Sequence, residues 1–122
     1  MRFTIHFLAA VPLALSLGLP LAVHAADPYV DAMREEGRKL ERADKVREEI
    51  RADEHAERQR PAGKSALTQA EFEGLLRRDG AESYTLYGQL NAQKRGKVFE
   101  SYRVSGKMSD AKRRIIDFYL GL

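Results

Sequence analysis

The chain has 122 residues, of which 43% are hydrophobic, 32% charged and only 8% aromatic, with a formal net charge of +3. This length allows one small domain with an extension. There is no cysteine, which excludes disulfides, thiolate metal sites, iron–sulfur clusters and a cysteine nucleophile. Two of the three histidines lie within the first 24 residues, which leaves His55 alone in the remainder. We therefore expect neither a metal nor another cofactor.

Residues 1–25 have the pattern of a signal peptide. Arg2 is followed by an uncharged stretch, with an apolar run over residues 7–19, then Pro20 and small residues up to Ala25. This pattern predicts Sec-type export and cleavage near Ala25, and hence a periplasmic or secreted protein. The alternative is a retained membrane anchor, because an uncharged stretch of this length can also span a bilayer.

Residues 26–60 are predicted to form a long charged helix, from about Tyr29 to Arg58. Pro28 suits the first helical position, and acidic residues lie four positions before basic ones, a spacing that stabilises helices. The apolar positions are sparse and form a broken heptad pattern. We expect a narrow apolar stripe that packs on something else, with self-association as the alternative. The expected pairs are Glu35 with Lys39, Glu41 with Lys45, and Glu54 with Arg58.

Residues 61–66 read as a linker, and residues 67–122 as a small domain of four short helices. Pro61 and Gly63 end the first helix. The segment Thr68-Gln69-Ala70-Glu71 predicts a capping box with Leu67 as a hydrophobic staple. The fold class is therefore all-α: a long charged N-terminal helix followed by a compact bundle of about four short helices.

The expected bounds of the four helices follow from their capping residues. The first ends near Asp79 with Gly80 left-handed, the second covers 81–90, the third covers 92–104 after Asn91, and Ser109 caps the fourth, 110–120. The predicted core consists of Phe72, Leu75, Leu76, Tyr84, Leu90, Val98, Phe99, Tyr102, Ile115, Ile116 and Tyr119.

Catalytic signatures are missing from the sequence. His55 stands among acidic residues on a charged helix, there is no Gly-x-Ser-x-Gly elbow, and the glycines are scattered singly. Paired carboxylates on an exposed helix are typical of a solvated face, since acid catalysis needs a buried carboxyl group. We therefore expect a non-enzymatic protein.

The charge distribution is asymmetric. Residues 92–122 carry eight basic and three acidic side chains, whereas residues 26–91 carry twelve basic and fifteen acidic ones. A basic end attracts anionic surfaces, such as phospholipid or lipopolysaccharide. The outline of residues 98–118 also resembles a helix-turn-helix, but an exported protein seldom meets DNA, so we expect no nucleic acid partner.

Two short segments are similar to the repeated Leu-Thr-x-x-Gln signature of the Spy/CpxP periplasmic chaperones. Residues 67–71 read Leu-Thr-Gln-Ala-Glu and residues 90–94 read Leu-Asn-Ala-Gln-Lys. Glu71 and Lys94 replace the glutamine and Asn91 replaces the threonine, so no functional residue is transferred. The resemblance implies a small, helical, exported protein.

Together these patterns predict a protein-binding, chaperone-like or adaptor module of the cell envelope. Its contact surface is expected on the charged helix or on the aromatics Tyr84 and Tyr87. The alternative is a basic module that docks on anionic membrane or lipopolysaccharide. The basic residues of that surface are Arg95, Lys97, Arg103, Lys107, Arg113 and Arg114.

Overall fold

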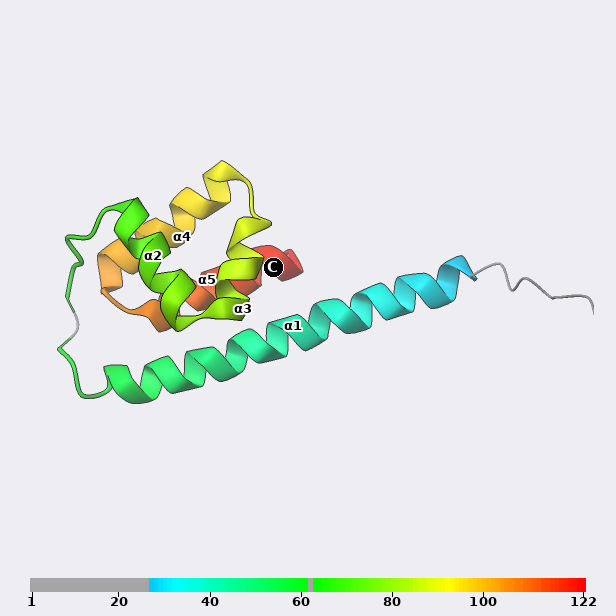
Figure 1. The fold of residues 1–122 in the computed structure, drawn as a ribbon, viewed down its shortest axis with the longest axis horizontal. Helices are drawn as coiled ribbons and strands as arrows, with labels where there is room; N and C mark the ends of the chain where they lie inside the picture. Colours follow the sequence, from blue (N-terminus) through cyan, green and yellow to red (C-terminus); the bar gives the residue numbers. More distant parts are fainter. Residues whose placement is uncertain (1–26, 62) are drawn as a thin grey trace, which may run out of the picture.

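The computed structural model describes residues 27–61 and 63–122, and all regular structure within them is helical. This confirms the all-α prediction. The predicted signal peptide lies outside the described residues. Figure 1 shows one long helix beside a cluster of four short ones. The helices are α1 (Pro28–Glu57), α2 (Gln69–Asp79), α3 (Ala81–Gly88), α4 (Ala92–Ser105) and α5 (Met108–Leu120).

Local capping accounts for three of the helix starts. The Asp27 side chain accepts a hydrogen bond from the Tyr29 amide at 3.0 Å before α1. Thr68 and Glu71 form the predicted capping box of α2, and the Thr68 hydrogen bonds lower the pKa of Glu71. Asn91 accepts from the Lys94 amide at 2.8 Å before α4. These residues satisfy amide groups that the first turn leaves unpaired.

Two expectations about helix ends are wrong. Gly80 has φ −155°, an extended conformation and not a left-handed one, because the chain passes directly from α2 into α3. Ser109 does not precede α5, which already begins at Met108 after Lys107. The reason is that an acceptor from another helix replaces the local cap, as described below.

Gly106 is the left-handed residue that ends α4. Its φ is 68°, and a Cβ atom at this position would lie 2.1 Å from the carbonyl oxygen of Gly63. Nearby, the Ser65 amide donates to the Arg103 carbonyl at 2.9 Å. The linker is therefore held against the end of α4, where only a glycine fits.

The core combines the short helices with the second half of α1. Phe72 lies at its centre, with ring centroids 6.1 Å from Tyr87, 5.7 Å from Phe99 and 5.0 Å from Tyr102. Of the predicted core, Leu75, Tyr84, Phe99 and Tyr119 are only partly buried. The predicted core left out the buried residues Leu86, Tyr87 and Ala111. The buried residues Ala43, Val46 and Ile50 of α1 agree with the expected packing of a narrow apolar stripe.

The long helix has two parts with different surroundings. Its second half packs chiefly against α5 and also contacts α3. Its first half extends past the cluster of short helices into solvent (Figure 1). The change comes near Lys39, whose ammonium lies 5.7 Å from the centroid of the Tyr119 ring. We call residues 28–42 the projecting segment.

Candidate functional site

Three carboxylates hold the second half of α1 on the other helices. Glu49, Asp53 and Glu57 are spaced four residues apart, so they lie on one face of the helix. Each reaches a group far away in the sequence. Sequence reasoning treated this acidic spacing as a solvated surface and therefore missed its role.

Glu49 caps helix α3 from outside. Its carboxylate accepts the backbone amides of Glu82 at 3.0 Å and of Ser83 at 3.2 Å, and also the Ser83 hydroxyl. No side chain within α3 makes a cap hydrogen bond. A negative charge at a helix N-terminus is favourable, since the unpaired amides carry partial positive charge.

Glu57 caps helix α5 in the same way. It accepts the Ser109 amide at 3.1 Å and the Ser109 hydroxyl at 2.5 Å. Ser109 is buried, with 2% of its surface exposed. The sequence predicted that Ser109 caps this helix, but its hydroxyl donates to Glu57 instead.

Asp53 lies between the two caps and faces the buried amine of Lys112. The Lys112 Nζ atom is 2.5 Å from an Asp53 carboxylate oxygen and donates to the Asp79 carbonyl at 3.3 Å. Lys112 is fully buried. Burial is the largest influence on Asp53 and raises the pKa of its carboxyl group, although Lys112 opposes this shift.

This polar contact between helices is structural in character. The Lys112 amine has no exposed surface, and its protein partners already occupy it. A solute could reach the amine only if α1 separated from α5. The carboxylates therefore set the position of α1 and, with it, the direction in which the projecting segment points.

The projecting segment carries most of the exposed large apolar side chains. Within residues 27–61 and 63–122 there are six such side chains, and four belong to this segment. The exposed fractions are 69% for Tyr29, 40% for Val30, 59% for Met33 and 46% for Leu40. Large apolar groups concentrated on one short segment are typical of an interaction site.

Three of these side chains form a regular line together with Gly37. Val30, Met33, Gly37 and Leu40 are spaced by three, four and three residues, which places them on one helix face. We call this line the exposed stripe. The buried residues Ala43, Val46 and Ile50 form a second line about a third of a turn away. The exposed stripe therefore lies to one side of the line that packs on the short helices.

Two of the six predicted basic contact residues have acidic partners. Arg103 contacts Glu100 at 2.8 Å, and Arg113 contacts Asp110 at 3.0 Å as well as Glu54. Arg95 and Lys107 are half-buried. Lys97 and Arg114 are exposed and line a shallow hollow with Val104, where Glu100 and Asp110 lie too. Ion pairs therefore neutralise this basic surface at Arg103 and Arg113.

The predicted ion pairs within α1 have mixed outcomes. Glu41 and Lys45 pair as expected, at 3.2 Å. Glu35 instead lies 3.6 Å from Arg38, since Lys39 turns towards Tyr119. The third expected pair, Glu54 with Arg58, is replaced because Arg113 of α5 approaches Glu54.

The two tyrosines of the predicted aromatic contact surface, Tyr84 and Tyr87, are not fully exposed in the structure. Tyr87 is 2% exposed and donates to Glu73 at 2.7 Å. Burial is the main cause that raises the pKa of its hydroxyl to about 12. Tyr84 is half-buried, with the Arg77 guanidinium 5.9 Å from its ring centroid. Tyr87 is therefore a core residue.

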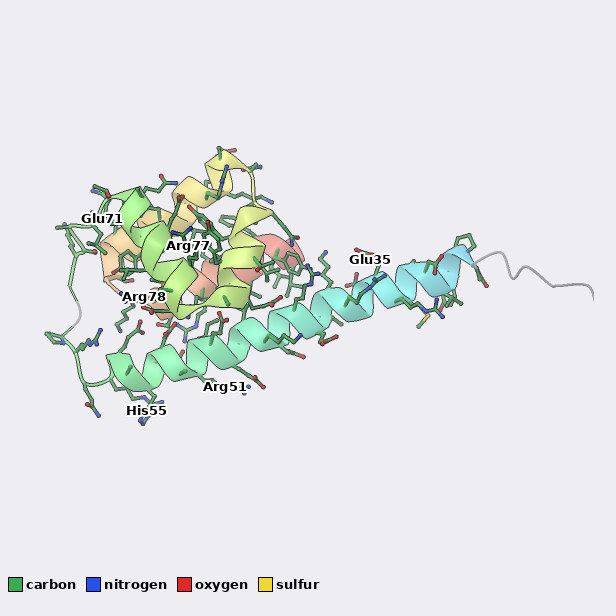
Figure 2. The ribbon with its side chains drawn as sticks, viewed as in Figure 1. Glu35, Arg51, His55, Glu71, Arg77 and Arg78 are labelled. Atoms are coloured by element: carbon green, nitrogen blue, oxygen red, sulfur yellow. The ribbon has the colours of Figure 1, made fainter. Side chains whose placement is uncertain are left out.

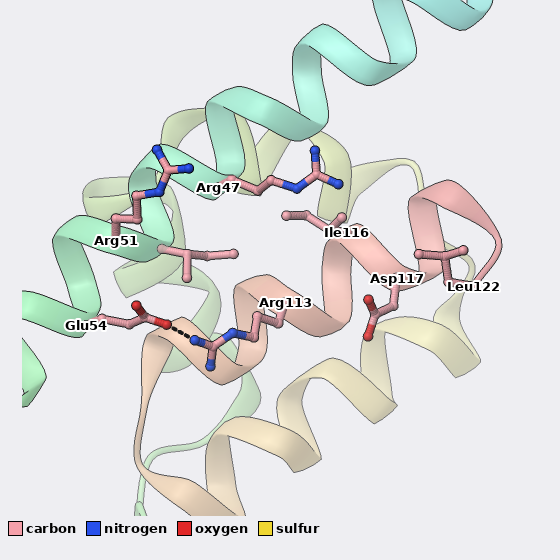
Figure 3. A pocket seen from close by; sticks show the side chains of 8 residues that line it. Arg47, Arg51, Glu54, Arg113, Ile116, Asp117 and Leu122 are labelled. Carbon is pink, nitrogen blue, oxygen red and sulfur yellow. Dashed lines mark ion pairs between the residues drawn. The ribbon is translucent and has the colours of Figure 1, made fainter.

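Figure 3 shows an open hollow between α1 and α5. Arg47, Arg51 and Arg113 line it together with Ile116, and Glu54 pairs with Arg113 across it. The hollow is shallow and mixed in charge, so it lacks the enclosed surface of a small-molecule site.

His55 is exposed on the side of α1 away from the short helices (Figure 2). Across residues 27–61 and 63–122 no group of three histidines and carboxylates could hold a metal ion. No helix in these ranges is long and apolar enough to cross a membrane.

Two basic residues of the helix-turn-helix outline have contacts within the protein. Lys112 points into the protein interior and Arg113 pairs with Glu54. Comparison of the chain with protein families, curated proteins and solved structures finds no match. A function for this chain must therefore be inferred from the arrangement of its helices and side chains.

Proposed function

We propose that this chain is a non-enzymatic, exported protein-binding module of the cell envelope, chaperone-like or adaptor in role. The projecting segment is its contact surface. The observation that carries the proposal is the exposed stripe, whose large side chains remain in solvent although the protein has a well-formed core. Covering such a stripe with another protein removes apolar surface from water.

The way α1 is anchored supports this role. Glu49, Asp53 and Glu57 hold the second half of the helix, so the first half is presented in a defined direction. A preorganised helix loses less conformational freedom on binding than a flexible chain does. The alternative, docking on anionic lipid or lipopolysaccharide, has less support because Arg103 and Arg113 already have acidic partners.

The test compares Met33→Glu with Ala32→Glu as bait for envelope proteins. Both residues are exposed on the projecting segment and both changes add one negative charge, but only Met33 belongs to the exposed stripe. We expect Met33→Glu to lose the proteins that co-purify with the native chain, and Ala32→Glu to retain them. Identical partner lists from all three chains would contradict the proposal.

Two further measurements test the other parts of the proposal. Mass spectrometry of the exported protein should show an N-terminus at residue 26 or 27. Anionic vesicles should bind weakly, and Lys97→Glu should leave the co-purifying proteins unchanged. Tight vesicle binding that falls steeply with salt would favour the lipid alternative.

A further inference from the structure

We infer that the exposed stripe pairs with the same stripe of a second copy of this chain, in antiparallel orientation. The inference rests on the proposed function, since it names the partner of that surface. The inference rests on a helix face that is complementary to itself. When two copies run in opposite directions, large residues lie opposite small ones and acidic residues lie opposite basic ones.

The apolar positions match when the two helices run in opposite directions. Val30 then faces Leu40 of the second copy, and Met33 faces Gly37 of the second copy. Gly37 is a glycine inside a helix, and a Cβ atom there would meet nothing within 4 Å. The fold itself therefore does not require a glycine at this position, whereas close approach of a second helix does. The Met33 side chain fills the space that Gly37 leaves.

The charges favour the same orientation. Residues 31–36 contain three acidic side chains and one basic, a net charge of −2, whereas residues 38–42 contain three basic and one acidic, a net charge of +2. In the register that sets Val30 against Leu40, Asp31 lies level with Lys39 of the second copy, and Arg34 lies level with Glu36. Both are pairs of opposite charge, whereas Glu35 lies level with Glu35 of the second copy. Parallel pairing would place like charges together, which is unfavourable.

The short helices do not obstruct this arrangement. They cover the line Ala43, Val46 and Ile50, which lies about a third of a turn from the exposed stripe. Beyond Leu40, the same face of α1 continues with the exposed residues Asp44 and Arg47, and Arg47 marks where it reaches the hollow beside α5. Two chains can therefore overlap along the projecting segments with their compact parts at opposite ends.

A contact limited to two such segments is small, below about 1,200 Å² in total, so the dimer should be weak and concentration-dependent. Sedimentation of the exported chain from about 5 to about 500 µM should show a monomer–dimer equilibrium. We expect Met33→Glu to raise the dissociation constant at least about tenfold, as for a central interface residue. Ala32→Glu should change it less than about twofold, the level of a peripheral residue.

Cysteine cross-linking tests the orientation, since the native chain has no cysteine. A mixture of Val30→Cys and Leu40→Cys chains should form a mixed disulfide dimer. Val30→Cys alone should not, because its two thiols would lie about 15 Å apart along the helix axis. A Val30→Cys dimer without the mixed product would indicate parallel pairing and overturn the inference.

The outcomes separate this inference from the proposed function. A chain that stays monomeric over the whole concentration range overturns the inference. If Met33→Glu still abolishes capture of envelope proteins in that case, the proposed function stands with a different partner. If Met33→Glu changes neither dimer formation nor the capture of envelope proteins, both the inference and the proposed function are wrong. If the variants unfold at the same temperature as the native chain, a loss of dimer formation or of capture is not caused by a loss of folding.

Discussion

At the scale of single residues, Lys112 shows that the polarity of a side chain is a weak guide to its position. It stands in a run of basic residues, yet it is fully buried, 2.5 Å from the Asp53 carboxylate. Its partners come from α1 and from the end of α2. A buried charge is tolerated when an opposite charge and hydrogen bonds compensate for lost hydration.

Lys112→Met should lower the free energy of unfolding by about 3 kcal/mol, because it leaves the Asp53 charge without its partner. Exchanging both residues, as Lys112→Met with Asp53→Leu, should restore much of this loss, since no unpaired charge remains. Chemical denaturation of the four chains measures the coupling between the two sites. If Lys112→Met and the double variant lose the same free energy of unfolding, the unpaired charge of Asp53 is not the cause of the loss.

The raised pKa of Asp53 predicts an unusual pH dependence. Its ordinary pKa is 3.8, so the folded protein binds this proton more tightly than the unfolded chain does. The contribution of Asp53 to stability is therefore greatest below pH 3.8 and falls as pH rises through the folded pKa. Carboxyl NMR titration should place Asp53 above 3.8. A titration below that value would mean that Lys112 outweighs burial.

Of the glycines with positive φ, Gly106 is the one where a side chain should destabilise the fold most. Gly106→Ala adds about 1–2 kcal/mol of left-handed strain and a close contact with the Gly63 carbonyl. Gly121→Ala is the matched control, because Gly121 has φ 77° but nothing within 4 Å. Thermal unfolding should show a larger loss for Gly106→Ala, and equal losses would exclude the Gly63 contact as a cause.

At the scale of helices, the two halves of α1 have different surroundings. Its second half supplies apolar residues to the core and carboxylates to the starts of α3 and α5. Its first half contributes few contacts to the fold and carries the exposed stripe. A helix of 30 residues can serve both roles because its stable half nucleates the remainder.

Removing residues up to 38 should therefore leave the fold intact. We expect a chain of residues 39–122 to unfold within about 4 °C of the longer chain, the shift that about 1 kcal/mol causes in a domain of this size. The control is a chain of residues 51–122, which lacks Ala43, Val46 and Ile50 and should lose its cooperative transition. Loss of the transition in both chains would place the projecting segment within the folding unit.

At the scale of the whole molecule, the core depends on a segment that lies before the linker. The short helices bury Lys112, Ser83 and Ser109 only because α1 supplies their partners. Residues 63–122 by themselves would expose these groups and the apolar surface beneath α1. Small domains have little stability to lose.

We expect residues 63–122 alone to lack a cooperative unfolding transition. Adding a separate peptide of residues 39–60 should restore it, because the peptide provides both the apolar line and the three carboxylates. Circular dichroism during thermal unfolding, with and without the peptide, is the measurement. A cooperative transition without the peptide would show that the short helices form a core of their own.

The helices themselves could be predicted from the sequence, since their signals are local. Pro28, the Thr68–Glu71 capping box and Asn91 each act on residues a few positions away. Such signals act on any chain that contains them, so most of the predicted bounds agree with the structure to within one or two residues.

What only the tertiary structure decided are the contacts between distant residues. Glu49 meets Ser83, Glu57 meets Ser109, and Lys112 turns inward to Asp53. Nothing local distinguishes these carboxylates from their solvated neighbours on α1. Which apolar residues of α1 become buried depends on the helix that packs beside them. That packing arises only when the whole chain folds.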